Sequence, residues 1–201
     1  MTNSTDDLHG WVRHGRGDQT DWYDENTPPD TLASTLTAMA NGQGGKLLLG
    51  VVGPGGAIVG VRNVSNAVDR VLQAALSTDP PLLIPLPEVI RVNGKAIVIA
   101  QVPGGLPHAY AHEGRYLRRD GTHNIPLKAR DLRQLIVERG EISFESERTP
   151  RATLADLDMD RARSYANSLH LSGESSVEQI LMRRGCLIEI NGERYPTNAG
   201  I

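Results

Sequence analysis

The 201-residue sequence contains a single cysteine, Cys186, and its aromatic residues make up only 4% of the chain. One cysteine excludes an internal disulfide framework and any zinc site built from several thiolates. The low aromatic content leaves little material for a broad base-stacking platform of the kind that single-strand binders use. Because Cys186 lies among Leu187, Ile188 and Ile190, we expect a small buried core residue and not a nucleophile.

The sequence also lacks long apolar runs. No run approaches the length needed to cross a bilayer, and the first ten residues do not have the basic and then apolar layout of a signal peptide. We therefore expect a cytoplasmic protein without a membrane partner. A hydrophobic fraction of 39% with 22% charged residues is that of an ordinary soluble globular protein.

Charge is unevenly distributed along the chain, although the formal net charge is only -3. Residues 1–30 hold seven acids and two bases, whereas residues 91–140 hold nine bases and four acids, a net charge of +5. The basic block also contains His108, His112 and His123, which add positive charge as the pH falls. This asymmetry favours an anionic partner, although many such segments are only solvated faces.

Hydrophobic periodicity predicts both helices and strands over residues 1–145. Residues 1–30 are expected to be loop with one short strand at Trp22 and Tyr23. The further elements expected are a helix from 32 to 41 capped by Asp30, a hairpin of strands 46–52 and 57–61, a helix capped by Ser65, a hairpin of strands 88–92 and 96–102 around Asn93-Gly94, a strand at 115–119 and a helix at 128–139.

Residues 146–201 are expected to form a separate, small helical element after a polar linker at 143–150. Asp158 is expected to cap one helix, and Ser175 and Glu178 to form a capping box for a second that stops at Gly185. A hairpin then turns at Asn191-Gly192. Two helices and a hairpin are the layout of a winged-helix-like element, which we expect the chain to leave incomplete.

The stretch from Thr37 to Gly50, TAMANGQGGKLLLG, allows two interpretations. Its glycines can expose a nest of backbone amides that holds a phosphate, or they can simply let a helix stop and a strand start. A Walker motif is excluded, because Ala40 stands where its first glycine belongs and Leu47 where Ser or Thr would bind magnesium. A dinucleotide fingerprint is excluded as well, since the turn follows a helix and precedes a strand.

Two groups of residues could in principle bind a metal. Asp18, Asp21, Asp24 and Glu25 are interpreted as loop carboxylates and not as magnesium ligands of a nuclease. His108, His112 and His123 have no accompanying cysteine, and their loop-and-strand setting fixes no zinc geometry, so they are interpreted as surface or phosphate-facing histidines. We expect no metal and no cofactor.

The strand end at 116–124 carries the most suggestive chemistry. Arg118 and Arg119 should point to opposite faces of a strand, so at most one of them joins a given surface. Arg119 with Thr122, His123 and Asn124 can hold a phosphate, or it can anchor the turn through backbone carbonyls or an acid such as Asp21. Both interpretations remain open from the sequence.

The chain contains five segments, 21–23, 38–51, 58–61, 107–110 and 116–121, whose order and residues are informative together. They resemble the Schlafen AlbA_2 domain. That family reads as an acidic-Phe-Lys strand, an Ala-Phe-Ala-Asn-Thr-x-Gly-Gly turn with a Gly-Val-acidic strand end, a Val-Gly pair, a Pro-x-Tyr segment and a Tyr-x-x-Arg-x-Gly strand. Residues 181–201 resemble the segment after this domain in bacterial transcriptional regulators and RecG-like helicase-related proteins, so we expect an N-terminal portion of something longer.

The resemblance implies that residues 1–145 form a nucleic-acid-binding domain of the α+β class, a mixed β-sheet with packed helices, which is often called DNA-binding in bacterial regulators. Some animal Schlafen proteins cleave RNA with three carboxylates. Asp21 matches one of these positions, whereas Arg16 stands at the offset of a second, and Val52 and Gly53 stand at the third. Tyr23 replaces the usual Lys. The nuclease centre is incomplete, and we expect no catalytic residues.

The sequence thus predicts a cytoplasmic regulator domain that binds DNA or RNA mainly through phosphates, as a homodimer. The alternative is an oligomerisation module or a sensor of a nucleotide or other small anion. The expected nucleic-acid contacts are Gly44, Gly45, Lys46, Arg118, Arg119, His123, Lys128 and Arg130.

Overall fold

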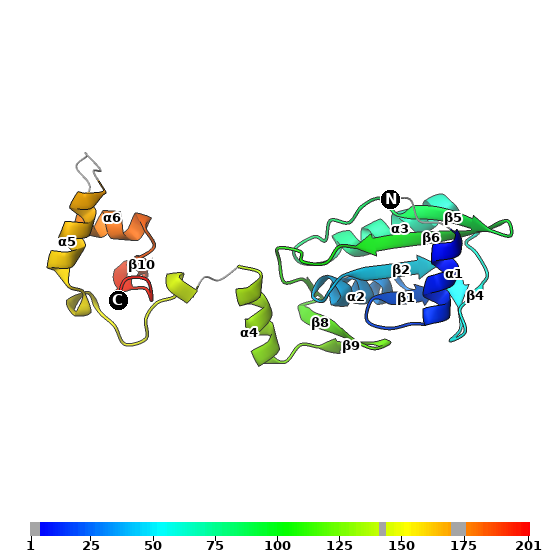
Figure 1. The fold of residues 1–201 in the computed structure, drawn as a ribbon, viewed down its shortest axis with the longest axis horizontal. Helices are drawn as coiled ribbons and strands as arrows, with labels where there is room; N and C mark the ends of the chain where they lie inside the picture. Colours follow the sequence, from blue (N-terminus) through cyan, green and yellow to red (C-terminus); the bar gives the residue numbers. More distant parts are fainter. Residues whose placement is uncertain (1–4, 141–143, 170–175) are drawn as a thin grey trace. The chain divides into compact units, whose positions relative to one another are not determined.

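The computed structural model describes residues 5–140, 144–169 and 176–201. The chain divides into two compact units, Met1–Arg139 and Gly140–Ile201 (Figure 1). None of the helices in these described ranges has the length and apolar character that a membrane crossing requires.

A four-stranded mixed sheet forms the centre of the first unit. Its strands, in spatial order, are β1 (Thr20–Tyr23), β2 (Gly45–Leu49), β6 (Lys95–Val102) and β5 (Glu88–Val92). β1 runs parallel to β2, and the other neighbours are antiparallel. As predicted, Asn93 and Gly94 join β5 to β6, with φ angles of 50° and 80°.

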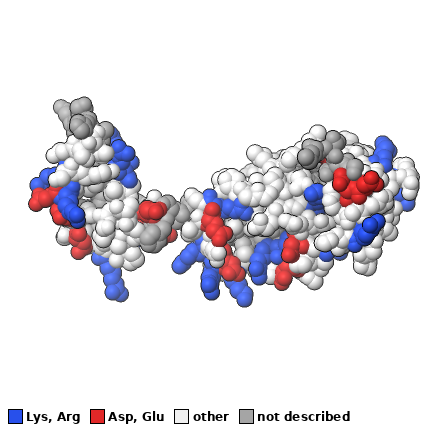
Figure 2. Space-filling view, viewed as in Figure 1, with Lys and Arg blue, Asp and Glu red and all other residues white. Residues whose placement is uncertain are grey.

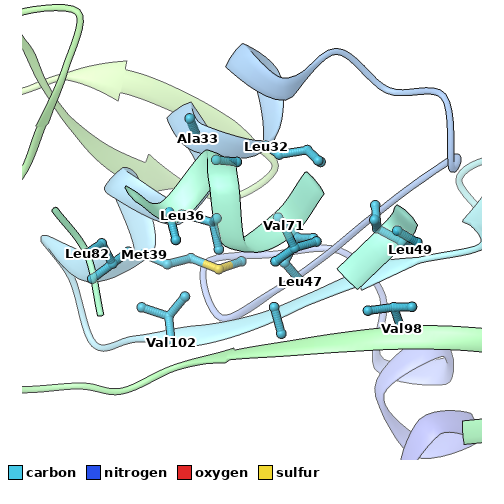
Figure 3. Close-up of a cluster of buried hydrophobic side chains, with 14 of the residues drawn as sticks. Leu32, Ala33, Leu36, Met39, Leu47, Leu49, Val71, Leu82, Val98 and Val102 are labelled. Atoms are coloured by element: carbon cyan, nitrogen blue, oxygen red, sulfur yellow. The ribbon is translucent and has the colours of Figure 1, made fainter. Parts of the chain in front are cut away.

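Both faces of the sheet are covered, because side chains of a central strand alternate between two cores. On one face Leu47 and Leu49 pack against α2 (Pro29–Ala40) and α3 (Val64–Leu76), as Figure 3 shows. On the other face Leu48 packs with Leu8 of α1 (Thr5–His14). A strand buried on both faces must be aliphatic at consecutive positions, which is what this run provides.

Helix α1 was not predicted, since residues 1–30 were expected to be loop around one short strand. Leu8, Trp11 and Val12 have helical spacing, and all three pack into the core on the Leu48 face of the sheet. Leu8 is fully buried. The strand expected at Trp22 and Tyr23 is confirmed as β1.

Helices α2 and α3 begin at other residues, or with other caps, than the sequence predicted. α2 starts directly after Pro28 without a side-chain cap, so Asp30 lies in its first turn and is not its cap. α3 is capped by Asn63, whose side chain accepts from the Asn66 amide at 3.0 Å, and not by Ser65. The predicted end of α2 at Asn41 is confirmed.

The aliphatic run 46–52 is two strands and not one. Gly50 has a φ of +98° and lies against the backbone of Gly60, which breaks the run between β2 and β3 (Val51–Val52). β3 pairs with β4 (Ala57–Ile58), so the predicted hairpin exists only as a short tip. β2 itself pairs with β1 and β6.

A second, three-stranded sheet packs beside α2 in the same unit. It consists of β7 (Ala111–His112), β8 (Arg115–Asp120) and β9 (His123–Pro126). The predicted helix after it is α4 (Ala129–Glu138), with Leu135 buried and Arg130 and Arg133 exposed.

The second unit contains the predicted order of two helices and a hairpin, after two short 3-10 turns, η1 (Phe144–Ser146) and η2 (Leu154–Asp156). α5 (Met159–Ser168) is capped by Asp158 as expected, and α6 (Val177–Arg183) precedes β10 (Leu187–Ile190) and β11 (Glu193–Pro196). The capping box of α6 is formed by Ser176 and Gln179 and not by Glu178, and the expected Ser175 lies outside the described residues. Cys186 is half-buried and not a core residue.

Candidate nucleic-acid interface

The glycine-rich turn ends α2 and starts β2 through its own backbone. The amide of Asn41 donates to the Thr37 carbonyl, and the amides of Gly42 and Gly44 donate to the Met39 carbonyl, each at 3.0 Å. These three amides are therefore not part of an open anion nest. Of the two interpretations of this turn, the structure supports the helix-to-strand turn.

Two glycines of the turn are required by close backbone approach. Gly44 has a φ of +76°, and a Cβ there would lie 2.4 Å from the carbonyl oxygen of Val102. A Cβ on Gly45 would lie 2.7 Å from the carbonyl oxygen of Gln19. Since neither distance is possible for a real Cβ, these positions exclude every side chain.

The side chain of Asn41 fastens the turn to the second sheet. Its Nδ2 donates to the carbonyl oxygens of Tyr110 at 2.7 Å and Leu117 at 2.9 Å. Its Oδ1 accepts from the Tyr110 amide at 2.7 Å. Asn41 is buried, so these bonds satisfy a polar group that would otherwise be costly to bury.

Arg139 closes the end of α2 from the far end of α4. Its guanidinium donates to the carbonyl oxygens of Leu106 and, at 3.1 Å, Ala40. A cation at a helix C-terminus complements the negative end of the helix dipole. These carbonyls hold the Arg139 side chain against the end of α2.

Beside the turn, a buried carboxylate is held between two arginines. Asp21 is fully buried and pairs with Arg16 and with Arg119, the latter at 2.9 Å between Nη2 and Oδ2. The Trp22 amide and the Tyr23 hydroxyl also donate to it, at 2.8 and 3.0 Å. The hydrogen bond to Asp21 raises the pKa of the Arg16 guanidinium. A carboxylate that accepts three hydrogen bonds and forms an ion pair with a second arginine has its oxygens occupied, which disfavours a role as a metal ligand.

The Arg119 side chain, 3% exposed, anchors the turn after β8. Besides Asp21 it contacts the carbonyl of Gly17 at 2.9 Å and Asn124 Oδ1 at 2.7 Å. Of the two interpretations left open by the sequence, the structure shows the anchor. Arg119 Nε is buried and has no hydrogen-bond partner among the described residues.

The hydrogen-bond network around Asp21 and Arg119 also includes the hydroxyls of Tyr23 and Thr35. The Tyr23 hydroxyl lies 2.8 Å from Thr35 Oγ1, and this oxygen accepts a hydrogen bond from Asn124 Nδ2 at 2.9 Å. Burial raises the pKa of the Tyr23 hydroxyl, because the phenolate is disfavoured away from water.

A cleft of about 1000 Å³ opens beside this network in the first unit. Its wall consists of the segment 14–20 before β1, the glycine-rich turn, the ends of β6 and β8, and one face of α4. Figure 2 shows Lys and Arg side chains gathered over α4, with acidic side chains between them. A bound ligand would thus meet charges of both signs.

Four cationic side chains and three acidic ones line the cleft. The cations are Arg16, Lys46, Arg118 and Arg119, and the acids are Asp18, Asp131 and Glu138. Arg16 and Arg119 are committed to Asp21, which leaves Lys46 and Arg118 to face a ligand. The Lys46 ammonium lies 4.9 Å from the ring centroid of Trp11, a cation–π contact that orients it.

The cleft brings together half of the contacts that the sequence predicted. Gly45, Lys46, Arg118 and Arg119 line it. The expectation that Arg118 and Arg119 serve separate surfaces is wrong, because the cleft reaches both the inward Arg119 and the exposed Arg118. The remaining predicted contacts are not in its lining: Gly44, His123, Lys128 and Arg130.

His108 and His123 are exposed, as predicted from the sequence, but His112 is not. Its side chain is 5% exposed, because β7 packs against α2. Trp11 and Arg16 were not predicted to be parts of the cleft. Trp11 could have been found from its helical spacing to Leu8, whereas the pairing of Arg16 depends on a loop conformation that no short pattern specifies.

The fold and the cleft together define an α+β domain with a two-sided sheet and a charged groove beside a glycine-rich turn. The chain belongs to the Schlafen AlbA_2 family, whose model matches residues 17–128. The match contains the glycine-rich turn, Asp21 and both cleft arginines of β8. Membership in this family indicates a nucleic-acid-related domain.

The solved structures that are similar to the chain include the following two. The DIP2311 protein of Corynebacterium diphtheriae has a TM-score of 0.50 at 19% identity, covering 96% of this chain and 38% of its own. The N-terminal domain of a RecG-related protein of Nitrosomonas europaea has a TM-score of 0.46 at 22% identity, covering 64% of this chain and 87% of its own. A search of curated proteins gives no match. The chain thus spans 38% of the DIP2311 protein, and this likeness concerns the fold alone.

Proposed function

We propose that the first unit binds DNA or RNA through the cleft, contacting phosphates and not base edges. The observation that carries the proposal is the placement of Lys46 and Arg118 in one cleft, while the neighbouring Arg16 and Arg119 are paired with Asp21. Family membership supports the nucleic-acid class of the ligand. Phosphate contacts give affinity with little sequence preference.

The proposed contact surface extends past the cleft along the start of α4. Lys128 and Arg130 are exposed and flank Leu127 and Asp131, which line the cleft. His123 is exposed at the start of β9. We keep these three as outer contacts. We leave out Gly44, since its amide donates to Met39.

The hydrogen bonds within the glycine-rich turn weaken the rival function. A nucleotide sensor built on this turn would need open amides there, and those of Asn41, Gly42 and Gly44 are taken. A nuclease function is weakened by Asp21, which is fully buried between two arginines. Binding without cleavage is therefore the activity we propose.

We further propose that the domain works as a homodimer in a cytoplasmic transcriptional regulator. Two ligand-facing cations per cleft give modest affinity, and two copies on one duplex would raise it through effective concentration. Sedimentation equilibrium of the whole chain should give twice the monomer mass at micromolar concentration. A monomer mass over that range, with or without DNA, contradicts this part of the proposal.

The binding proposal is tested by fluorescence anisotropy with labelled duplex DNA, single-stranded DNA and RNA of one sequence, and with a scrambled duplex. We expect a slope of log K against log salt of about -2 to -4 for two to four phosphate contacts. The affinity for the scrambled duplex should lie within about threefold of that for the first duplex. Discrimination between sequences requires base contacts, and the proposed interface makes none. A flat salt response contradicts the proposal.

A further inference from the structure

A buried histidine at the end of β7 lies outside the lining of the cleft. This residue, His112, has a side chain that is 5% exposed. Neither Nδ1 nor Nε2 has a hydrogen-bond partner among the described residues. Because a buried polar group without a partner is costly, such an imidazole calls for a ligand.

Two carboxylates converge on this imidazole from different elements. Asp30 comes from the first turn of α2, and its Oδ1 lies 3.8 Å from His112 Nε2. Glu113 follows His112 in the turn to β8, with a φ of +51°. One potential ligand atom from each of the three residues lies within 4.8 Å of the other two.

The backbone holds these three residues in place. The backbone amides and carbonyls of Asp79 and Ala111 exchange hydrogen bonds of 2.8 and 2.7 Å. They hold the backbone of β7 at the residue before His112. Asn41 bonds to Tyr110 and so ties the same segment to the other end of α2. The imidazole is therefore fixed, whereas the Asp30 and Glu113 side chains, 78% and 58% exposed, can rotate.

We propose that Asp30, His112 and Glu113 bind a zinc ion. One imidazole and two carboxylates are ligands that Zn²⁺ accepts, with water in the fourth position. Ligand atoms around tetrahedral zinc lie about 3.3–3.6 Å apart, given bonds of about 2.0–2.2 Å. Small rotations of the two exposed carboxylates close the observed spacing to that value. The two carboxylate charges balance the charge of the ion.

Two features oppose the ion and set its affinity. Arg115 Nη2 lies 2.8 Å from Glu113 Oε2, so zinc must compete with this exposed ion pair. The N-terminal end of α2 carries a partial positive charge near Asp30. Zinc would thus bind reversibly and fasten the β7–β8 turn to the start of α2. None of the three ligands lines the cleft, so this inference does not depend on nucleic-acid binding.

The test is calorimetric titration of the whole, tag-free and chelator-treated chain with ZnCl2. The wild type should bind one ion, and Asp30→Asn and Glu113→Gln should each weaken binding at least about tenfold. Both positions are exposed, so these variants should fold, which circular dichroism checks. His123→Ala, at an exposed histidine outside the cluster, is the matched control and should bind as the wild type does.

A second readout guards against adventitious binding. Cobalt in place of zinc should give the visible absorption of a tetrahedral site with nitrogen and oxygen ligands, and the band should vanish in His112→Ala if that variant folds. Zinc should also raise the melting temperature of the wild type and not of Asp30→Asn. Absence of stoichiometric binding, or binding that Asp30→Asn and Glu113→Gln leave unchanged, overturns the proposal.

Discussion

Asp21 is the residue whose removal should most damage the first unit. It is fully buried, and its loss leaves Arg16 and Arg119 without their counter-charge. We predict that Asp21→Ala lowers the free energy of unfolding by about 3–5 kcal/mol, since breaking a buried ion pair leaves an uncompensated charge. Urea denaturation followed by circular dichroism measures this.

Asp69→Ala is the control for that prediction, because Asp69 is exposed on α3. Its effect should stay within about 0.5 kcal/mol. Equal effects of the two substitutions would show that the Asp21 network contributes nothing particular to stability.

From the buried hydroxyl of Tyr23 we predict that the free energy of unfolding depends on pH in the alkaline range. Burial raises its pKa above the ordinary value of 10.0, so the folded state holds the phenol proton more tightly than the unfolded state does. This contribution to stability is complete below pH 10 and is lost as the pH rises through the folded-state pKa. The free energy of unfolding of the wild type should therefore fall more steeply with pH in that range than that of Tyr23→Phe.

Tyr116→Phe, which alters a second tyrosine of the same unit, is the matched control and should keep the wild-type slope. The comparison uses slopes and not absolute stabilities, because Tyr23→Phe also removes the hydrogen bonds to Asp21 and Thr35. If wild type and Tyr23→Phe have the same slope above pH 10, the burial of this hydroxyl has no energetic consequence.

The glycine-rich turn is an element determined by packing and not by a ligand. Gly44 and Gly94 both have positive φ angles, but Gly44 is crowded, because a Cβ there would lie 2.4 Å from the Val102 carbonyl oxygen. At Gly94, among the described residues beyond its two chain neighbours, no atom lies within 4 Å of such a Cβ. Gly94→Ala should cost about 1–2 kcal/mol from the backbone angle alone. Gly44→Ala should cost at least about 2 kcal/mol more, because backbone cannot move aside as a side chain can. Similar melting temperatures of the two variants would contradict this explanation of the turn.

Elements with a local signal were predicted well from the sequence. The hairpin at Asn93-Gly94, the helix at 128–139 and the hairpin at Asn191-Gly192 depend on turn chemistry or helical periodicity within a few residues. The elements that were missed depend on partners far along the chain. Helix α1 gains its stability from packing on the second face of the sheet, and polar flanking residues hide its short apolar stripe.

The candidate site was predictable only in part, for the same reason. Lys46 and Arg118 were found because they are charged residues beside a turn and a strand end. The pairing of Arg119 with Asp21 joins β8 to β1, two strands that belong to different sheets and lie far apart in the sequence, so no local pattern reveals it. The burial of His112 follows from β7 packing on α2, and an alternating pattern of two residues does not reveal it.

For the molecule as a whole, the net charge of -3 is a poor guide to its partner. Acidic and basic side chains are segregated, and internal pairing then decides which cations meet the solvent. In the cleft this leaves Lys46 and Arg118, out of four cationic side chains. We therefore expect nucleic-acid binding to depend on a small number of residues of the first unit.

The most direct test compares Arg118→Ala with Arg91→Ala in anisotropy titrations of duplex DNA at several salt concentrations. Both residues are exposed arginines of the first unit, but Arg91 lies on β5, at the sheet edge opposite β1. We predict that Arg118→Ala weakens binding about three- to tenfold and makes the salt slope shallower by about 1, while Arg91→Ala changes neither. Wild-type affinity and slope in Arg118→Ala, or equal losses in both variants, would contradict binding through the cleft.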